Sequence, residues 1–261
     1  MSQTPSQACC NTPPVVSKGY QEKGEYTTID GLKTYVTGPK SAAGILVVYD
    51  IFGFFPQTLQ GADILSGLHH KPTESKNKFT VFMPDFFEGK PADISWYPPD
   101  NEEKGKKLGE FFNTTAAPPK TVAKVAKVVQ ELKQKYPDIQ NWGVLGYCWG
   151  GKIVNLVSQE GTPFKAAVTA HPAMVDPADA PKVAIPMLVL PSKDESKDDI
   201  AKYQNGLKVT NDVQWFDDQV HGFLAARGNL EDENVKKAYE KGYSLLSTWF
   251  TEHLGTKDSK L

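Results

Sequence analysis

A cysteine set between closely spaced glycines is the strongest chemical signal in this chain. Residues 146–151 read Gly-Tyr-Cys-Trp-Gly-Gly, after the apolar run 142–145 and before a segment with helical apolar spacing. Glycines two residues before and after a nucleophile permit a sharp strand-to-helix turn, because side chains there would collide with the neighbouring chain. The turn would hold the Cys148 thiol at a helix N-terminus, whose N–H groups favour a thiolate. The pattern predicts a cysteine nucleophile.

An acid and a histidine should follow Cys148, in that order, at the ends of later strands. Residues 191–195 read Pro-Ser-Lys-Asp-Glu and follow an apolar run, and residues 217–223 read Asp-Asp-Gln-Val-His-Gly-Phe and follow another. We predict His221 as the base and Asp194 as the acid that orients it. Glu195, the next residue, is an open alternative for the acid.

Other residues are expected to contact the substrate. The backbone N–H groups of Ile51 and Trp149 would stabilise an oxyanion. His171 stands in Ala-His-Pro at another strand end and could line the pocket. Arg227 is the only arginine among 29 basic residues and lies just past His221. Its guanidinium could hold a carboxylate through two parallel bonds, or it could pack on the protein and meet the acids of the following helix.

The elements that would position these residues alternate along the chain. Six apolar runs are expected as strands, several of them apolar throughout as in parallel strands buried on both faces: residues 43–49, 79–83, 142–145, 164–170, 185–190 and 213–216. Helical spacing marks residues 121–136 and the C-terminal segment, for which Asn229 is the expected N-cap. The alternation predicts an α/β fold, a mostly parallel sheet with helices on both faces.

One domain accounts for the chain. Residues 1–27, with Cys9 and Cys10, are expected as an N-terminal arm, residues 28–255 as the catalytic domain and residues 256–261 as a tail. A net charge of −2 favours neither nucleic acid nor an anionic membrane as partner, and no apolar stretch is long enough to span a membrane. Three cysteines do not form a disulfide framework and indicate a reducing compartment.

The last three residues, Ser-Lys-Leu, form the tripeptide that peroxisomal import reads. We therefore expect the import receptor as a partner and a peroxisomal location, with the cytoplasm as the alternative. A monomer and a homodimer are both compatible with the sequence.

The cysteine turn, the Lys-Asp-Glu segment at 193–195 and the run from His221 to Gly228 together resemble the dienelactone hydrolase family, of the α/β-hydrolase superfamily. Asp50-Ile51-Phe52-Gly53 and residues 35–39 add to the resemblance, the latter with the fungal branch. The resemblance implies hydrolysis of small lactones and esters, with no metal or organic cofactor. Family members often carry glutamate at the position of Asp50, paired with the resting thiol. Bacterial members hold the substrate carboxylate with two arginines, whereas this chain offers Arg227 and a lysine such as Lys90.

The expected reaction is acyl transfer through a thioester on Cys148, followed by hydrolysis. Two alternatives stay open. One is a thioesterase or acyltransferase that tailors a metabolite in the peroxisome, for which the lysines at 104, 106 and 107 are weak support. The other is a non-catalytic binding or redox-responsive protein on the same fold, against which an intact Cys-His-Asp set argues.

Overall fold

The computed structural model describes residues 14–15, 19–67 and 79–255. The paired cysteines at 9 and 10 and the C-terminal tripeptide lie outside these residues. Within the described ranges no helix is both long and apolar enough to cross a membrane.

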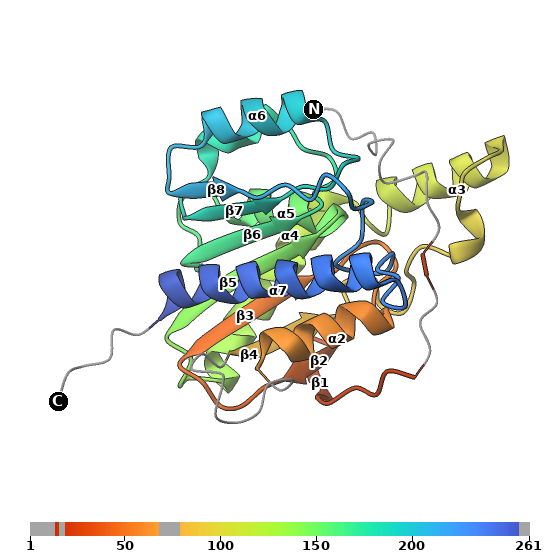
Figure 1. Ribbon diagram of the computed structural model, residues 1–261. Helices are drawn as coiled ribbons and strands as arrows, with labels where there is room; N and C mark the ends of the chain where they lie inside the picture. Colours follow the sequence, from red (N-terminus) through yellow and green to blue (C-terminus); the bar gives the residue numbers. More distant parts are fainter. Residues whose placement is uncertain (1–13, 16–18, 68–78, 256–261) are drawn as a thin grey trace.

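A single sheet of eight strands forms the centre of the molecule (Figure 1). The strands are β1 (Glu25–Ile29), β2 (Leu32–Thr37), β3 (Ala43–Val48), β4 (Thr80–Pro84), β5 (Asn141–Tyr147), β6 (Ala166–Ala170), β7 (Met187–Leu190) and β8 (Asn211–Val213). Their order across the sheet is β1-β2-β4-β3-β5-β6-β7-β8. The β1–β2 and β2–β4 pairs are antiparallel and all later pairs are parallel. The predicted mostly parallel sheet is confirmed.

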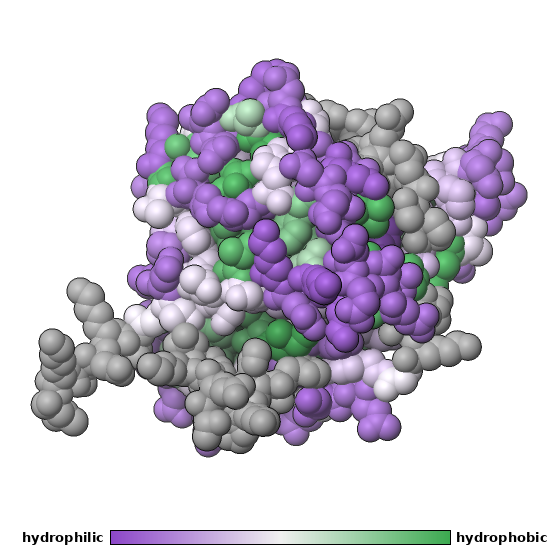
Figure 2. All heavy atoms as spheres, viewed as in Figure 1, coloured by the Kyte–Doolittle hydropathy of each residue, from purple (hydrophilic) through white to green (hydrophobic). Residues whose placement is uncertain are grey.

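Helices cover both faces of this sheet, which is why its central strands are apolar on both sides. Every residue of β3, β4, β6 and β7 is buried. Helices α2 (Pro56–Leu65) and α7 (Glu233–Leu254) pack together on one face, and α4 (Pro118–Lys135) and α5 (Trp149–Val157) pack together behind the sheet in Figure 1. Hydrophilic side chains cover much of the outer side of the α7 face, with hydrophobic ones in patches between them (Figure 2).

Several expected boundaries are corrected by the structure. Strand β1 begins at Glu25, so the sheet starts inside the range 1–27 expected as an arm. The C-terminal helix is capped by Asp232, whose carboxylate accepts the N–H groups of Asn234 and Val235. The predicted cap Asn229 instead accepts the N–H of Glu231 in the preceding turn.

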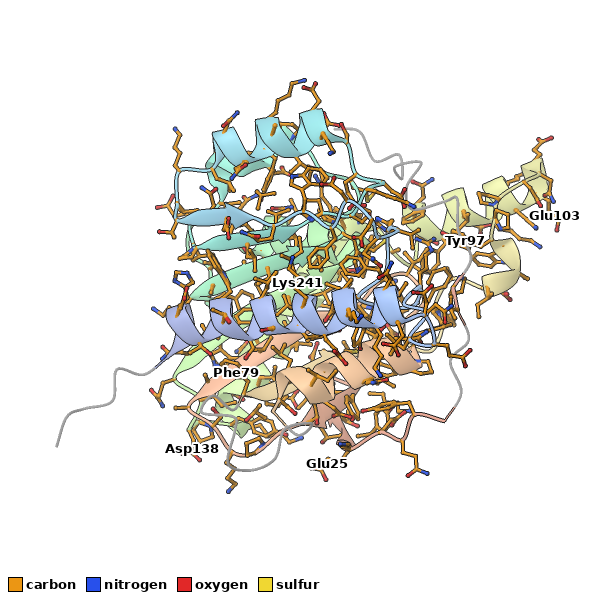
Figure 3. All side chains as sticks on the ribbon, viewed as in Figure 1. Glu25, Phe79, Tyr97, Glu103, Asp138 and Lys241 are labelled. Atoms are coloured by element: carbon orange, nitrogen blue, oxygen red, sulfur yellow. The ribbon has the colours of Figure 1, made fainter. Side chains whose placement is uncertain are left out.

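The segment after β4 leaves the body before returning at α4. It contains the short helix η1 (Ile94–Trp96) and the helix α3 (Glu102–Asn113), which was not predicted. Figure 3 shows Tyr97 where this segment meets the body and Glu103 far out on α3. Two further elements, η2 (Pro177–Lys182) and α6 (Lys197–Gly206), pack against each other beyond β7 and β8. The predicted site residues follow the carboxyl ends of β3 and of β5 to β8.

Candidate active site

Cys148 occupies the turn between β5 and α5 in a strained backbone conformation. Its φ is 53° and its ψ is −116°, a region that residues other than glycine rarely adopt. The Cys148 N–H donates to the Ala170 carbonyl at the end of β6, and its carbonyl accepts from Ala173. The side chain is buried. The sharp turn expected from the glycine spacing is present.

The two flanking glycines are required by close backbone contacts. A Cβ on Gly146 would lie 2.2 Å from the Gly150 carbonyl oxygen, and a Cβ on Gly150 would lie 2.1 Å from that of Val48. Both distances are far below van der Waals contact. The N-terminus of α5 can therefore approach β3 only because these two positions lack side chains.

His221 is paired with a buried carboxylate from the turn after β7. Its Nδ1 lies 2.6 Å from Glu195 Oε1, and both side chains are almost completely buried. The other oxygen of Glu195 accepts the Ser192 N–H. A carboxylate on Nδ1 fixes the proton on that nitrogen and leaves Nε2 as the reactive atom of the neutral ring.

The prediction of Asp194 as the residue that contacts the imidazole is wrong by one position. Asp194 is exposed, and its Oδ2 accepts the backbone N–H of His221 at 2.8 Å. Adjacent residues in this turn point in opposite directions, so only one carboxylate can enter the site. The longer side chain, Glu195, points inward and reaches the ring, whereas Asp194 holds the loop that carries the ring.

The amides expected to form the oxyanion hole lie on the turn after β3 and at the start of α5. Trp149 is the first residue of α5, where helix N–H groups have no acceptor within the helix. Its indole donates to the Ala116 carbonyl and packs on the Phe87 ring. Ile51 is buried, and its carbonyl accepts from Ala92. Both residues are therefore firmly held next to the elbow.

Asp50, expected to contact the substrate, ties two loops together. Its Oδ1 accepts the Phe52 N–H at 2.9 Å and its Oδ2 accepts the Ala226 N–H at 3.2 Å. Burial raises the pKa of the Asp50 carboxyl, although these two hydrogen bonds and the charge of Arg227 oppose the rise. The carboxyl thus connects the Ile51 turn to the loop that follows His221.

His171 lies directly against the paired histidine. Its ring centroid is 5.2 Å from that of His221, and on another side it stacks on Tyr147. The residue is fully buried at a φ of 36°, and neither ring nitrogen has a hydrogen-bond partner among the described residues. Burial lowers the pKa of the His171 imidazole well below its usual value, and the nearby His221 lowers it further. The ring is therefore a neutral imidazole inside the site.

Arg227 is buried in the loop that follows His221. Its Nη1 donates to the His221 carbonyl at 3.3 Å, and its guanidinium lies 5.8 Å from the ring centroids of both Phe52 and Tyr97. These two aromatic rings contact each other, with their centroids 5.1 Å apart. Tyr97 comes from the irregular segment after β4.

Lys90, named as a second cation for the substrate, lies elsewhere. It lines a cavity of about 300 Å³ with Trp96, Lys107 and Glu110, between α3 and the loop after β4. In the described part of the chain, no three His, Cys, Asp or Glu side chains are grouped as metal ligands would be.

The strand order and the cysteine elbow define an α/β-hydrolase. The sequence model of the dienelactone hydrolase family matches residues 32–254. The chain belongs to this family and is a carboxylic ester hydrolase of the dienelactone hydrolase type.

Relatives and solved structures agree with this assignment. An AIM2 family protein of Schizosaccharomyces pombe is 34% identical over 254 residues, which cover 93% of this chain and 98% of the relative. A human carboxymethylenebutenolidase homolog is 29% identical, with 78% of this chain and 81% of the relative covered. The crystal structure of a dienelactone hydrolase from Anabaena variabilis has a TM-score of 0.61 at 14% identity, over 90% of this chain and 98% of that one. This last likeness concerns the fold.

Proposed function

We propose that the protein hydrolyses small lactones or activated esters through Cys148, with His221 as the general base and Glu195 as the acid that orients it. The observation that carries the proposal is the strained cysteine elbow, bonded to the end of β6, where the next residue, His171, lies against a buried His221–Glu195 pair 2.6 Å apart. A purely structural cysteine would not require two glycines in backbone contact around it.

In the first step His221 takes the proton of the Cys148 thiol, and the thiolate attacks the carbonyl carbon to form a tetrahedral oxyanion. The Ile51 and Trp149 N–H groups stabilise that charge, and a donor of this kind contributes about 3–4 kcal/mol. As the carbon–oxygen bond breaks, His221 donates a proton to the leaving oxygen and a thioester remains on Cys148. Until His221 gives up this proton it is an imidazolium, and the Glu195 carboxylate stabilises its positive charge.

In the second step His221 removes a proton from water, which attacks the thioester. Collapse of the second tetrahedral intermediate releases the carboxylic acid and regenerates the thiolate. A thiol attacks well at neutral pH, and departure of an enolate or another good leaving group requires little protonation. We therefore infer a preference for enol lactones and activated esters over unactivated esters.

Arg227 supports a narrower proposal about the substrate, which is that it bears a free carboxylate. The guanidinium lies beside the His221 carbonyl and next to the contacting rings of Phe52 and Tyr97, a place from which it can bind an anion that enters the site. A hydrogen bond to a charged group contributes about 1.5–3 kcal/mol, equivalent to roughly ten- to hundredfold in affinity. Arg227→Met should raise KM for a carboxylated lactone by that factor and leave KM for its neutral methyl ester nearly unchanged.

The decisive experiment is turnover by the wild type and Cys148→Ala across enol lactones, activated esters, saturated lactones and thioesters. We expect the wild type to turn over enol lactones and activated esters rapidly, and Cys148→Ala to turn over none of the substrates. Iodoacetamide should label Cys148 of the wild type stoichiometrically. Full activity of Cys148→Ala would exclude the proposed nucleophile. Faster turnover of thioesters than of all oxygen esters would favour the thioesterase alternative.

The peroxisomal destination is proposed from residues 259–261 alone. A fluorescent reporter that ends in this tripeptide should accumulate in peroxisomes, and removal of Leu261 should release it. A reporter that stays diffuse in cells with working import would favour the cytoplasm.

A further inference from the structure

The backbone that carries Arg227 is held on both sides by groups from distant parts of the chain. The Ala226 N–H donates to Asp50 Oδ2 at 3.2 Å, and the Ala226 carbonyl accepts the Val15 N–H at 2.9 Å. The Arg227 N–H donates to the Gly222 carbonyl, which closes the loop back towards His221. The two successive peptide groups that precede the Arg227 side chain are thus fixed by three hydrogen bonds.

The buried amide of Gln57 joins these contacts into one unit. Its Nε2 donates both protons, one to the Val15 carbonyl at 2.8 Å and one to the Gly228 carbonyl at 3.0 Å. Gln57 lies on α2, is fully buried and is separated from Gly228 by 171 positions in sequence. A buried polar side chain costs stability unless it is hydrogen-bonded, so its place here is explained by the two carbonyls it connects.

A second residue of α2, Asp63, also binds the N-terminal arm. Asp63 of α2 accepts hydrogen bonds from the Tyr20 hydroxyl and the Lys23 N–H in the arm, and from Tyr35 and Thr37 of β2. Helix α2 therefore binds the arm at Asp63 and, near its own N-terminus, at Gln57. Val15 of the arm is therefore part of the structure that surrounds residues 226–228, which carry Arg227.

We propose that Gln57 is a positioning residue for Arg227, and that Gln57, Val15 and Asp50 form a clamp on residues 226–228. The clamp keeps the guanidinium fixed beside the Phe52 and Tyr97 rings before substrate arrives. Fixing a side chain in advance lowers the entropy cost of binding. The link to substrate choice rests on the proposed function, in which Arg227 binds a carboxylate.

Arg227 allows this clamp to be tested directly, since it is the only arginine in the chain. Phenylglyoxal, which modifies guanidinium groups, therefore has one target whose reaction rate reports its accessibility. In the wild type the side chain is buried and should react slowly. We expect Gln57→Leu to react about tenfold faster, as follows from loss of two ordinary hydrogen bonds that hold a buried segment. Gln57→Glu keeps the size of the side chain and should change the rate in the same direction, because a carboxyl group has at most one proton to donate to the two carbonyls.

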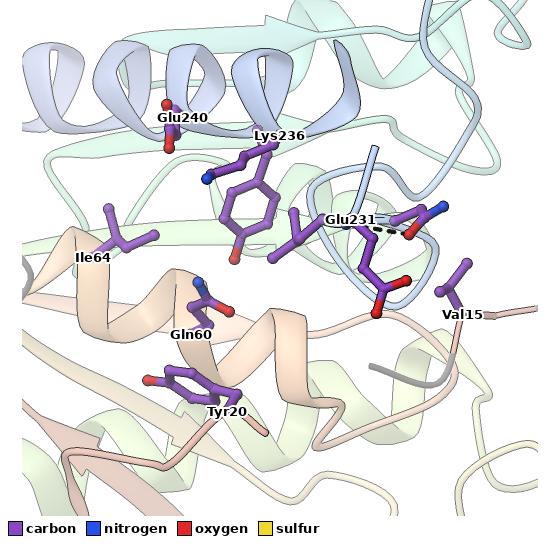
Figure 4. A pocket seen from close by; sticks show the side chains of 10 residues that line it. Val15, Tyr20, Gln60, Ile64, Glu231, Lys236 and Glu240 are labelled. Carbon is purple, nitrogen blue, oxygen red and sulfur yellow. Dashed lines mark hydrogen bonds between the residues drawn. The ribbon is translucent and has the colours of Figure 1, made fainter. Parts of the chain in front are cut away.

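The matched control is Gln60→Leu, one turn further along α2. Gln60 lines the cavity of about 430 Å³ between α2, Val15 and α7 (Figure 4) and does not belong to the clamp. Its phenylglyoxal rate should equal that of the wild type. Circular dichroism and the unfolding midpoint of each variant separate local release of the arginine from global unfolding.

The second measurement is the ratio of KM values for a carboxylated lactone and its methyl ester. The Gln57 variants should shift this ratio in the same direction as Arg227→Met, and Gln60→Leu should not. An unchanged phenylglyoxal rate in folded Gln57→Leu and Gln57→Glu would overturn the clamp, whatever the kinetics. Faster modification with a KM ratio unaffected by both Gln57→Leu and Arg227→Met would support the clamp and reject the carboxylate-binding role of Arg227.

Discussion

The turn after β5 and the turn after β7 each deliver a side chain to the site, but they are held by different forces. The β5 turn is fixed by contact between backbones, since Gly146 and Gly150 have no space for a Cβ. The β7 turn is fixed by hydrogen bonds, in which Glu195 and Asp194 bind the ring and the backbone of His221. Steric contact of this kind is intolerant of any added atom, whereas a hydrogen-bonded turn can lose one bond and keep its shape. A substitution that adds an atom to the β5 turn should therefore displace the backbone, whereas one that removes a hydrogen bond from the β7 turn should leave the backbone in place.

The largest effect is expected from Gly150→Ala. The new Cβ would lie 2.1 Å from the Val48 carbonyl oxygen, so α5 must move away from β3 and carry the Trp149 amide with it. We expect loss of detectable hydrolysis and a fall in unfolding free energy of about 1–3 kcal/mol, as for other overpacked sites. Steady-state kinetics and urea unfolding measure the two quantities.

Gly109→Ala is the control, because a Cβ on Gly109 in α3 meets no atom within 4 Å. Alanine is favoured over glycine in a helix by up to about 1 kcal/mol, so this variant should be slightly more stable and fully active. Normal activity in Gly150→Ala would mean that the β5 turn can accept an added Cβ, and the proposed difference between the two turns would be wrong.

The next effect separates the two carboxylates of the β7 turn. Glu195→Gln should lower kcat by on the order of 10³–10⁴-fold, because an amide cannot stabilise the imidazolium and can favour the wrong tautomer. Asp194→Asn keeps an oxygen that accepts the His221 N–H, so we expect a loss of less than about tenfold, equivalent to 1.4 kcal/mol or less. Kinetics of both variants on one activated ester provide the comparison. The reverse order of effects would return the role of acid to Asp194.

The contrast between the turns also explains how much the sequence could predict. The elbow is encoded by residue types at fixed spacing, so Cys148 and its flanking strand and helix could be located from the sequence. The order of acid and histidine along the chain located the two later loops. Nothing within the Lys-Asp-Glu segment at 193–195 indicates which carboxylate points inward, because contacts with the β8 loop decide that.

Other parts of the site depend on contacts across long stretches of sequence. Gln57 bonds to a carbonyl 171 positions away, and helix α2 has no strong apolar periodicity that would have marked it. Tyr97 belongs to a segment rich in proline and charge. The antiparallel strands β1 and β2 mix polar and apolar residues, and the expected strands did not include them. The strands β3, β4, β6 and β7 could be predicted because they are buried along their whole length and rich in apolar residues.

The smallest effect concerns His171, whose neutral ring lies between Tyr147 and His221. The folded state holds this imidazole at a pKa well below 6.5, whereas the unfolded chain binds a proton near that pH. The unfolded state therefore takes up more protons below pH 6.5, and stability falls with decreasing pH by up to about 1.4 kcal/mol per unit. His171→Phe removes this term and keeps an aromatic ring against Tyr147. In urea unfolding at pH 7.5, 6.5 and 5.5, the free energy of unfolding of the variant should rise relative to that of the wild type only below pH 6.5. A difference between the two proteins that stays constant over this range would show that His171 binds its proton equally in both states, and the neutral buried ring would have to be abandoned.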